Sequence, residues 1–165
     1  MNLGRIARHL LAMPGAVKRA FPPATMAAIE QAIARSEKQH RGEVRFAVEA
    51  DLDALALLAG HSARSRAIEV FSLLRVWDTE ENNGVLIYLL LADRDVEIVA
   101  DRGINSLVGS AEWEGICRIM EAALRRGEFE QAVLAAIEAV TRLLAQHFPP
   151  RAGDRNELAN RPAAI

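Results

Sequence analysis

Oxygen-bearing side chains gather in two groups along the sequence, and each group could bind a divalent cation. The first group is Asp78, Asn83, Asp101 and Glu43, which the predicted strands bring to one edge of a sheet. Carboxylate, amide and carbonyl oxygens that converge from several loops are the ligands that Ca²⁺ and Mg²⁺ prefer. We therefore predict a Ca²⁺ or Mg²⁺ site at this edge. The alternative is structural, because Asn-Gly before a strand favours a turn and Asp78 is suited to capping a helix end or turn.

The second group surrounds a predicted hairpin turn at the opposite edge of the sheet. It contains Asp51, Asp93, Arg94 and Asp95. Ligands of parallel α/β sheets bind at the carboxyl ends of the strands, which favours this group as the alternative site. A hairpin turn in which Asp93 bonds its own backbone explains the same residues without a ligand. The sequence leaves both sites open.

Nucleophilic catalysis has little support in the sequence. The four histidines occur in unrelated contexts, no serine lies in a nucleophile-elbow motif, and no glycine-rich phosphate loop is present. Cys117, the single cysteine, falls on the apolar side of a predicted helix, where we expect a core residue. A phosphatase would have to use metal-activated water, with Arg94 or Arg102 steadying the phosphate.

The composition is typical of one globular domain. The chain has 165 residues, of which 51% are apolar and 25% charged, and its formal net charge is −2. We expect no nucleic-acid binding, because this charge gives no general attraction and no recognition motif is present. The longest apolar run, residues 85–91, is too short to cross a membrane. The N-terminal segment lacks the long apolar stretch and cleavage site of a signal peptide.

Hydrophobic periodicity predicts the elements that position these residues. A helix is expected over 25–40, and strict alternation predicts a strand over 43–49 with one wetter face. Two helical stretches follow between residues 53 and 77. The apolar run 85–91 predicts a strand covered on both faces, and a turn at 92–95 leads into a strand over 96–100. A helix is expected from its N-cap at Ser110 to near Gly127, and another from Phe129 to His147.

These elements predict an α/β fold. Strand 43–49, the crossover helix and strand 85–91 make a parallel βαβ unit, and the antiparallel hairpin completes a mixed β-sheet with helices on both faces. We divide the chain into a basic amphipathic arm (1–22), the α/β domain (23–148) and a tail (149–165) too polar to order itself. The arm fits peripheral contact with anionic lipid, a helix packed on the domain, or a frayed end.

In this order the motifs resemble the TPM domain family, the thylakoid acid phosphatase-like and bacterial TPM proteins. The matching pieces cover about 25–148: Gly42-Glu43-Val44, a crossover helix ending near Trp77, Asp78 ahead of Asn82-Asn83-Gly84, Asp93-Arg94 at the turn, and Gly103. Many members carry Gly-Tyr-Gly-Leu-Glu-Gly and a later aspartate. Here residues 101–106 read Asp-Arg-Gly-Ile-Asn-Ser, and the later aspartate is missing near 109–110.

The resemblance implies a non-enzymatic, divalent-metal-binding module that assists the assembly or maintenance of membrane-associated proteins through a protein partner. The alternative that it implies is a weak metal-dependent acid phosphatase. A function that needs the missing carboxylate is not expected in this chain. We expect a cytoplasmic location, with peripheral contact at the inner membrane through residues 1–20 left open.

Overall fold

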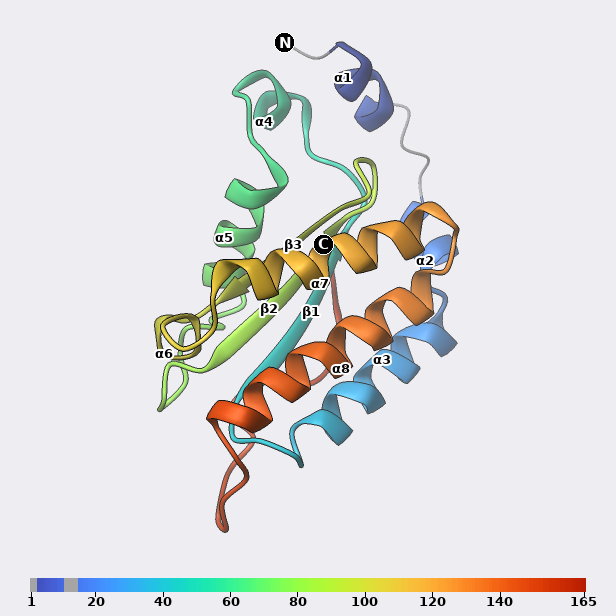
Figure 1. The fold of residues 1–165 in the computed structure, drawn as a ribbon. Coiled ribbons are helices and arrows are strands. Elements are labelled where there is room, and N and C mark those ends of the chain that lie inside the picture. Colours follow the sequence, from blue (N-terminus) through green and yellow to red (C-terminus); the bar gives the residue numbers. More distant parts are fainter. Residues whose placement is uncertain (1–2, 11–14) are drawn as a thin grey trace.

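The computed structural model describes residues 3–10 and 15–165, which form a four-stranded mixed sheet between two layers of helices (Figure 1). The strands are β1 (Glu43–Glu49), β2 (Gly84–Leu90), β3 (Asp95–Ala100) and β4 (Ala163–Ala164), in the order β3-β2-β1-β4. β1 and β2 are parallel, and β2 and β3 are antiparallel. The predicted parallel βαβ unit and hairpin are therefore confirmed.

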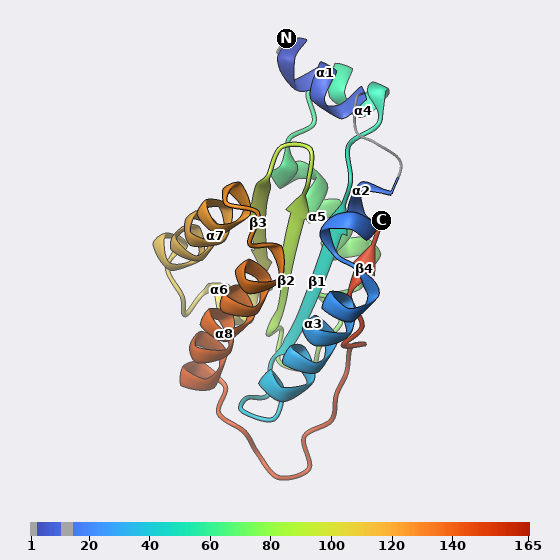
Figure 2. The same cartoon turned by 90° about the vertical axis from the view of Figure 1, so that its right-hand side faces the viewer.

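Helices cover both faces of the sheet, as predicted (Figure 2). Their bounds are α1 (Leu3–Leu10), α2 (Ala16–Ala20), α3 (Pro23–Ser36), α4 (Ala54–Leu58), α5 (Ala63–Leu73), α6 (Arg102–Asn105), α7 (Ser110–Arg125) and α8 (Phe129–His147). α3, α7 and α8 pack on one face, and α4 and α5 pack on the other. The predicted N-cap of α7 shifts by one residue, since Gly109 occupies that position and Ser110 begins the helix.

Side chains of β1 and β2 alternate between two hydrophobic cores. Phe46 and Ile87 belong to the core beneath α3, α7 and α8, whereas Leu86 belongs to the core beneath α4 and α5. Every residue of both strands is buried. The prediction that 85–91 is covered on both faces is confirmed, but the wetter face of β1 is not observed. Helix α5 and the segment before β4 cover that face, so Glu43 and Glu49 are buried with it.

Residues 149–165 differ from the disordered tail that the sequence predicts. β4 lies parallel to β1, and the N–H of Ile165 donates to the carbonyl of Val48 at 3.0 Å. The Arg45 guanidinium donates to the carbonyl of Ala159. Main-chain hydrogen bonds and buried charges hold this segment, and these interactions compensate for its small apolar surface. The hydrophobic pattern of the sequence therefore gave no sign that this segment is ordered.

The N-terminal arm packs on the domain through α1, which contacts α4 at one end of the molecule (Figure 1). Residues 1–2 and 11–14 of the predicted arm lie outside the described residues. Among the helices formed by residues 3–10 and 15–165, none has the length and apolar character needed to cross a membrane. Contact of the arm with lipid stays a prediction.

Candidate functional site

Two of the residues predicted to bind a cation at the base of the sheet are held by other partners. Asp78 is exposed, and its carboxylate pairs with the Arg75 guanidinium at 2.6 Å. Glu43 is buried at the start of β1, where it accepts hydrogen bonds from the N–H groups of Glu157 and Leu158 at 2.8 and 3.2 Å. Glu43 therefore fastens the segment before β4, whereas Asp78 stabilises the exit from α5.

The other two residues, Asn83 and Asp101, each have one buried oxygen without a hydrogen-bond partner among the described residues. Asn83 donates from Nδ2 to the carbonyl of Arg41 at 2.9 Å, and Asp101 caps α6 by accepting from the N–H of Arg102 at 2.7 Å. Within 3–10 and 15–165, no group of three or more His, Cys, Asp or Glu side chains is arranged to hold a metal ion. The predicted carboxylates thus form no such group, and Ca²⁺ or Mg²⁺ binding stays a prediction.

Two glycines at the base are required by close packing. A Cβ at Gly84 would overlap the main-chain carbonyl of Val76, and one at Gly103 would lie 2.5 Å from the carbonyl oxygens of Glu81 and Asn82. The carbonyl of Asn82 also accepts from the N–H of Gly103 at 2.9 Å. These residues of the family motif therefore join the loop before β2 to α6, which is a structural role.

At the opposite end of the sheet, Asp93 anchors the N-terminal helix. Its carboxylate lies 2.7 Å from Arg5, 3.2 Å from Arg8 and 3.1 Å from Nε2 of His9. Burial acts to raise the pKa of Asp93, but hydrogen bonds from these three residues outweigh burial and lower it. Nδ1 of His9 accepts from the N–H of Leu52 at 2.9 Å. The hairpin turn is thus a docking point for α1.

The rest of the second predicted group is dispersed. Arg94 is exposed and adopts a φ of 52° at the turn, and Asp51 is half-buried in the segment after β1. Asp95 lines a groove at the edge of the sheet. Asp93 and Asp95 are close in sequence but lie in different surroundings.

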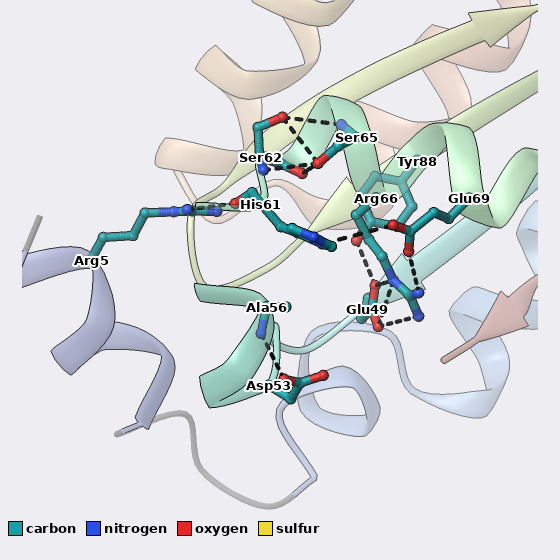
Figure 3. Close-up of polar contacts among 10 residues, drawn as sticks. All are labelled: Arg5, Glu49, Asp53, Ala56, His61, Ser62, Ser65, Arg66, Glu69 and Tyr88. Atoms are coloured by element: carbon teal, nitrogen blue, oxygen red, sulfur yellow. Dashed lines mark hydrogen bonds and ion pairs between the residues drawn. The ribbon is translucent and has the colours of Figure 1, made fainter. Parts of the chain in front are cut away.

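A polar network that the sequence did not predict ties α5 to the sheet (Figure 3). The hydroxyl of Tyr88 donates to Glu49 at 2.6 Å, and Arg66 donates to Glu49 and to Glu69, each at 2.9 Å. His61 lies 3.7 Å from Glu69. Burial, followed by the hydrogen bond to Glu49, raises the pKa of Tyr88.

This network stabilises the fold, and its interactions engage both Glu49 and Tyr88. Glu49 accepts from Tyr88 and Arg66 together, and Tyr88 keeps its proton at neutral pH. The signal that could have found the network is Tyr88 itself, because a tyrosine inside an otherwise apolar buried strand needs a partner for its hydroxyl. Arg5 extends the network to α1 by donating to the carbonyl of His61 at 2.8 Å (Figure 3).

A buried serine and histidine lie between α3 and α8, but their protons point the wrong way for catalysis. Nδ1 of His40 accepts from the N–H of Gly42 at 3.2 Å, so Nε2 carries the proton and donates to Ser36 at 2.8 Å. Ser36 then donates to Thr141 at 2.6 Å, and Thr141 donates to the carbonyl of Ile137. Burial lowers the pKa of His40 to about 4. His40 therefore cannot remove the serine proton.

A groove of 510 Å³ runs along the outer edge of β3, between this strand and α7. We call it the β3–α7 groove; its lining includes Arg64, Asp95, Glu97, Trp113, Cys117 and Glu121. β3 is the edge of the sheet, and no strand of the described residues pairs with it on this side. Sequence reasoning missed the groove because its walls come from distant segments.

Alternate residues of β3 direct their main-chain groups into the groove. The N–H of Asp101 bonds to β2. The antiparallel register therefore directs the main-chain N–H and C=O groups of Val96 and Ile98 away from β2. Side chains cover these outward groups, and the N–H of Ile98 bonds to the Cys117 thiol. The N–H of Val96 lies 3.5 Å from Glu121, and the carbonyl of Ile98 accepts from Arg64 at 2.6 Å.

The β3–α7 groove is acidic near the hairpin turn. Burial, followed by the charges of Glu97, Glu121 and Asp93, raises the pKa of Asp95 to about 6. The pKa of Glu97 is also raised, chiefly by burial. These carboxyl groups therefore share a region in which additional positive charge would be stabilising.

Two further side chains define the wall that α7 contributes. Burial raises the pKa of the Cys117 thiol to about 12, so the thiol stays protonated and is a poor nucleophile. Trp113 is only 6% exposed, and its Nε1 has no hydrogen-bond partner in the described part of the chain.

Two carboxyl groups, Glu37 at the end of α3 and Glu43 at the start of β1, lie close to the segment before β4. Burial, followed by the charge of Glu43, raises the pKa of Glu37 to about 8. Burial also raises the pKa of Glu43. One proton therefore stays with this pair near neutral pH, while Glu43 holds the N–H groups of residues 157 and 158.

Comparisons with known proteins agree with the observed fold. A family model described as the TPM domain matches residues 18–143. The chain is similar to the NMR structure of BA42 protein from the psychrophilic bacterium Bizionia argentinensis, with 30% sequence identity and a TM-score of 0.76. That match covers 86% of this chain and 93% of the other. No curated protein matches.

Proposed function

We propose that this chain, which belongs to the TPM domain family, is a non-enzymatic protein-binding module that holds an extended segment of a partner along β3. The observation that carries the proposal is the edge of β3 in the β3–α7 groove, which pairs with no strand of the described residues and is covered by side chains alone. In strand addition, main-chain hydrogen bonds supply affinity and alternate side chains supply specificity. An unpaired strand edge beside a helix provides both kinds of contact once its covering side chains turn aside.

The geometry of the groove suits a single added strand. A new strand would lie about 4.8 Å from β3 and pair with the outward groups of Val96 and Ile98. The N–H of Val96 and the carbonyl of Ile98 are covered by Glu121 and Arg64, whose long side chains can turn aside. The N–H of Ile98 bonds to the Cys117 thiol, a weak acceptor that a peptide carbonyl would replace. The partner segment would then lie between β3 and α7.

The proton positions of the reactive side chains support binding over catalysis. Nε2 of His40 is a donor, and Tyr88 and Cys117 both keep their protons at neutral pH. General-base or nucleophilic chemistry needs the opposite state in each case. The weak metal-dependent acid phosphatase of the sequence analysis has no specific observation in its favour, so we do not propose it.

The partner's setting is a further part of the proposal. We infer that the bound segment belongs to a membrane-associated protein undergoing assembly or maintenance, and the support for this is the family resemblance. Binding of Ca²⁺ or Mg²⁺ stays a prediction. An NMR titration of the ¹⁵N-labelled protein with each ion alone tests it.

The test is a titration of ¹⁵N-labelled protein with the peptide acetyl-Ser-Val-Thr-Val-Thr-Val-Ser-amide, followed by amide hydrogen exchange. We expect chemical-shift changes over residues 95–98 and 113–121. The amides of Val96 and Ile98 should exchange more slowly, while that of Glu97, which already faces β2, should not change. This alternation distinguishes strand addition from a general closing of the groove.

Two matched control peptides sharpen the result. One is N-methylated at its valines and the other at its threonines, so each lacks the N–H groups on one edge of the strand. Only one of them should lose binding, because only one edge can pair with β3. Equal loss with both peptides, shifts elsewhere in the protein, or no binding at all would refute the proposed function.

A further inference from the structure

The charges that line the β3–α7 groove are unbalanced. The lining contains four carboxyl groups and two guanidinium groups. Arg64 lies 3.4 Å from Glu97, and Arg118 lies 3.7 Å from Glu114, so each cation of the lining already has a partner. Asp95 forms no ion pair within residues 3–10 and 15–165, and it is the carboxyl group left without a cation.

The surroundings of Asp95 favour an added positive charge. Glu97, Glu121 and Asp93 all lie close enough to act on it unfavourably, and Arg5 is the nearby cation that acts in the opposite direction. Asp95 is only half-buried and borders the groove, so an incoming side chain can reach it. A single cationic group placed beside it would reduce the repulsion among these four carboxylates.

A second, independent feature of the groove is a buried hydrogen-bond donor without a partner. Trp113 is 6% exposed, lines the groove, and has no partner for Nε1 among the described residues. Leaving a buried donor unpaired costs about 1–3 kcal/mol. A main-chain carbonyl of an extended peptide is a suitable acceptor, whereas a free cation is not.

These two features together identify the occupant. Pairing of β3 with β3 of a second copy would bring Asp95 and Glu97 of both chains together, and like charges across a strand pair are destabilising. Resting on the proposed function, we infer that the groove selects an extended partner segment carrying a lysine or arginine, whose cationic group lies beside Asp95. The backbone of that segment supplies the acceptor for Trp113.

The test compares three peptides that differ at one position. These are acetyl-Ser-Val-Thr-Val-Thr-Val-Ser-amide and the variants in which its first threonine is lysine or glutamate. One partly exposed ion pair is expected to change the Kd by up to about fivefold. Lysine should therefore tighten binding about fivefold at low salt, and glutamate should weaken it. The lysine advantage should shrink at high salt, because screening shortens the range of the attraction.

Protein variants locate the effect. Asp95→Asn keeps the shape of the side chain and should abolish the preference for lysine, so that the lysine and threonine peptides bind this variant with the same Kd. Glu138→Gln, on the exposed face of α8, changes the net charge equally and should preserve the preference. A tryptophan fluorescence titration in a Trp77→Phe background, which leaves Trp113 as the one tryptophan, measures binding, and a circular dichroism spectrum establishes folding for each variant.

The outcomes separate the two proposals. If the threonine peptide binds along β3 and lysine gives no advantage, the proposed function stands and the cationic partner is refuted. If lysine is preferred and Asp95→Asn keeps the preference, the placement beside Asp95 is wrong. If none of the three peptides binds to β3, the proposed function itself fails.

Discussion

Replacing Glu37 by glutamine should remove a loss of stability that the protein suffers as the pH rises. Burial, followed by the charge of Glu43, raises the pKa of Glu37 from 4.5 to about 8. A carboxyl group with a raised pKa holds its proton more tightly in the folded state. Its contribution is therefore complete below pH 4.5 and is lost as the pH rises through about 8. Glutamine has no such proton and keeps an acceptor for the N–H of Val44.

The pKa values set the size of the effect. A change from 4.5 to about 8 corresponds to a ceiling of about 5 kcal/mol, at roughly 1.36 kcal/mol per pH unit. The partial exposure of Glu37 and the sharing of its proton with Glu43 reduce this value. We expect the free energy of unfolding of the wild type to fall by about 2 kcal/mol relative to Glu37→Gln between about pH 5 and pH 9.

Urea unfolding followed by far-UV circular dichroism measures this difference directly. Wild type, Glu37→Gln and the exposed control Glu138→Gln are unfolded across the pH range, and the difference between each variant and wild type is plotted against pH. The control difference should be flat. If the difference for Glu37→Gln is also flat, or if the wild type gains stability relative to it at high pH, the shared proton between Glu37 and Glu43 is refuted.

Three further outcomes are expected. Gly84→Ala should lower the free energy of unfolding by about 3 kcal/mol, because its Cβ overlaps a main-chain carbonyl, whereas Gly115→Ala inside α7 should raise it by up to about 1 kcal/mol; urea unfolding measures both. Tyr88→Phe should cost about 1–2 kcal/mol in thermal unfolding, because Glu49 loses a buried hydrogen bond. Asp93→Asn should speed amide exchange in residues 3–10 without affecting the sheet, because α1 loses the charge that holds Arg5 and Arg8.

The strands that lie between two cores were the easiest to predict from the sequence. β2 is buried on both faces, so its apolar run carries the signal directly. β1 was placed correctly, but its charged face looked solvent-exposed because Glu43 and Glu49 find their partners in other parts of the chain. β4 consists of Ala163 and Ala164, which have no pattern to read. Its position depends on main-chain hydrogen bonds to β1.

The candidate sites were harder to predict than the fold because they depend on distant contacts. Placing Asp93 at the hairpin turn was correct, yet its partners come from a basic arm whose charges resemble an ordinary solvated face. Trp113 reads as a core residue, and only the structure reveals that Nε1 lacks a partner. The groove joins residues 64, 95 and 121, which no local motif connects.

The distance along the chain between β1 and the segment that covers it also constrains the order of folding. Glu43 and Glu157 are 114 residues apart, so closing this contact carries a large loop-closure cost unless the intervening elements have folded first. The βαβ unit and hairpin can form from nearer contacts and should precede it. During synthesis, β1 therefore spends a period with its outer edge uncovered, and the pairing with β4 is expected to be the last step that protects it from association with other chains.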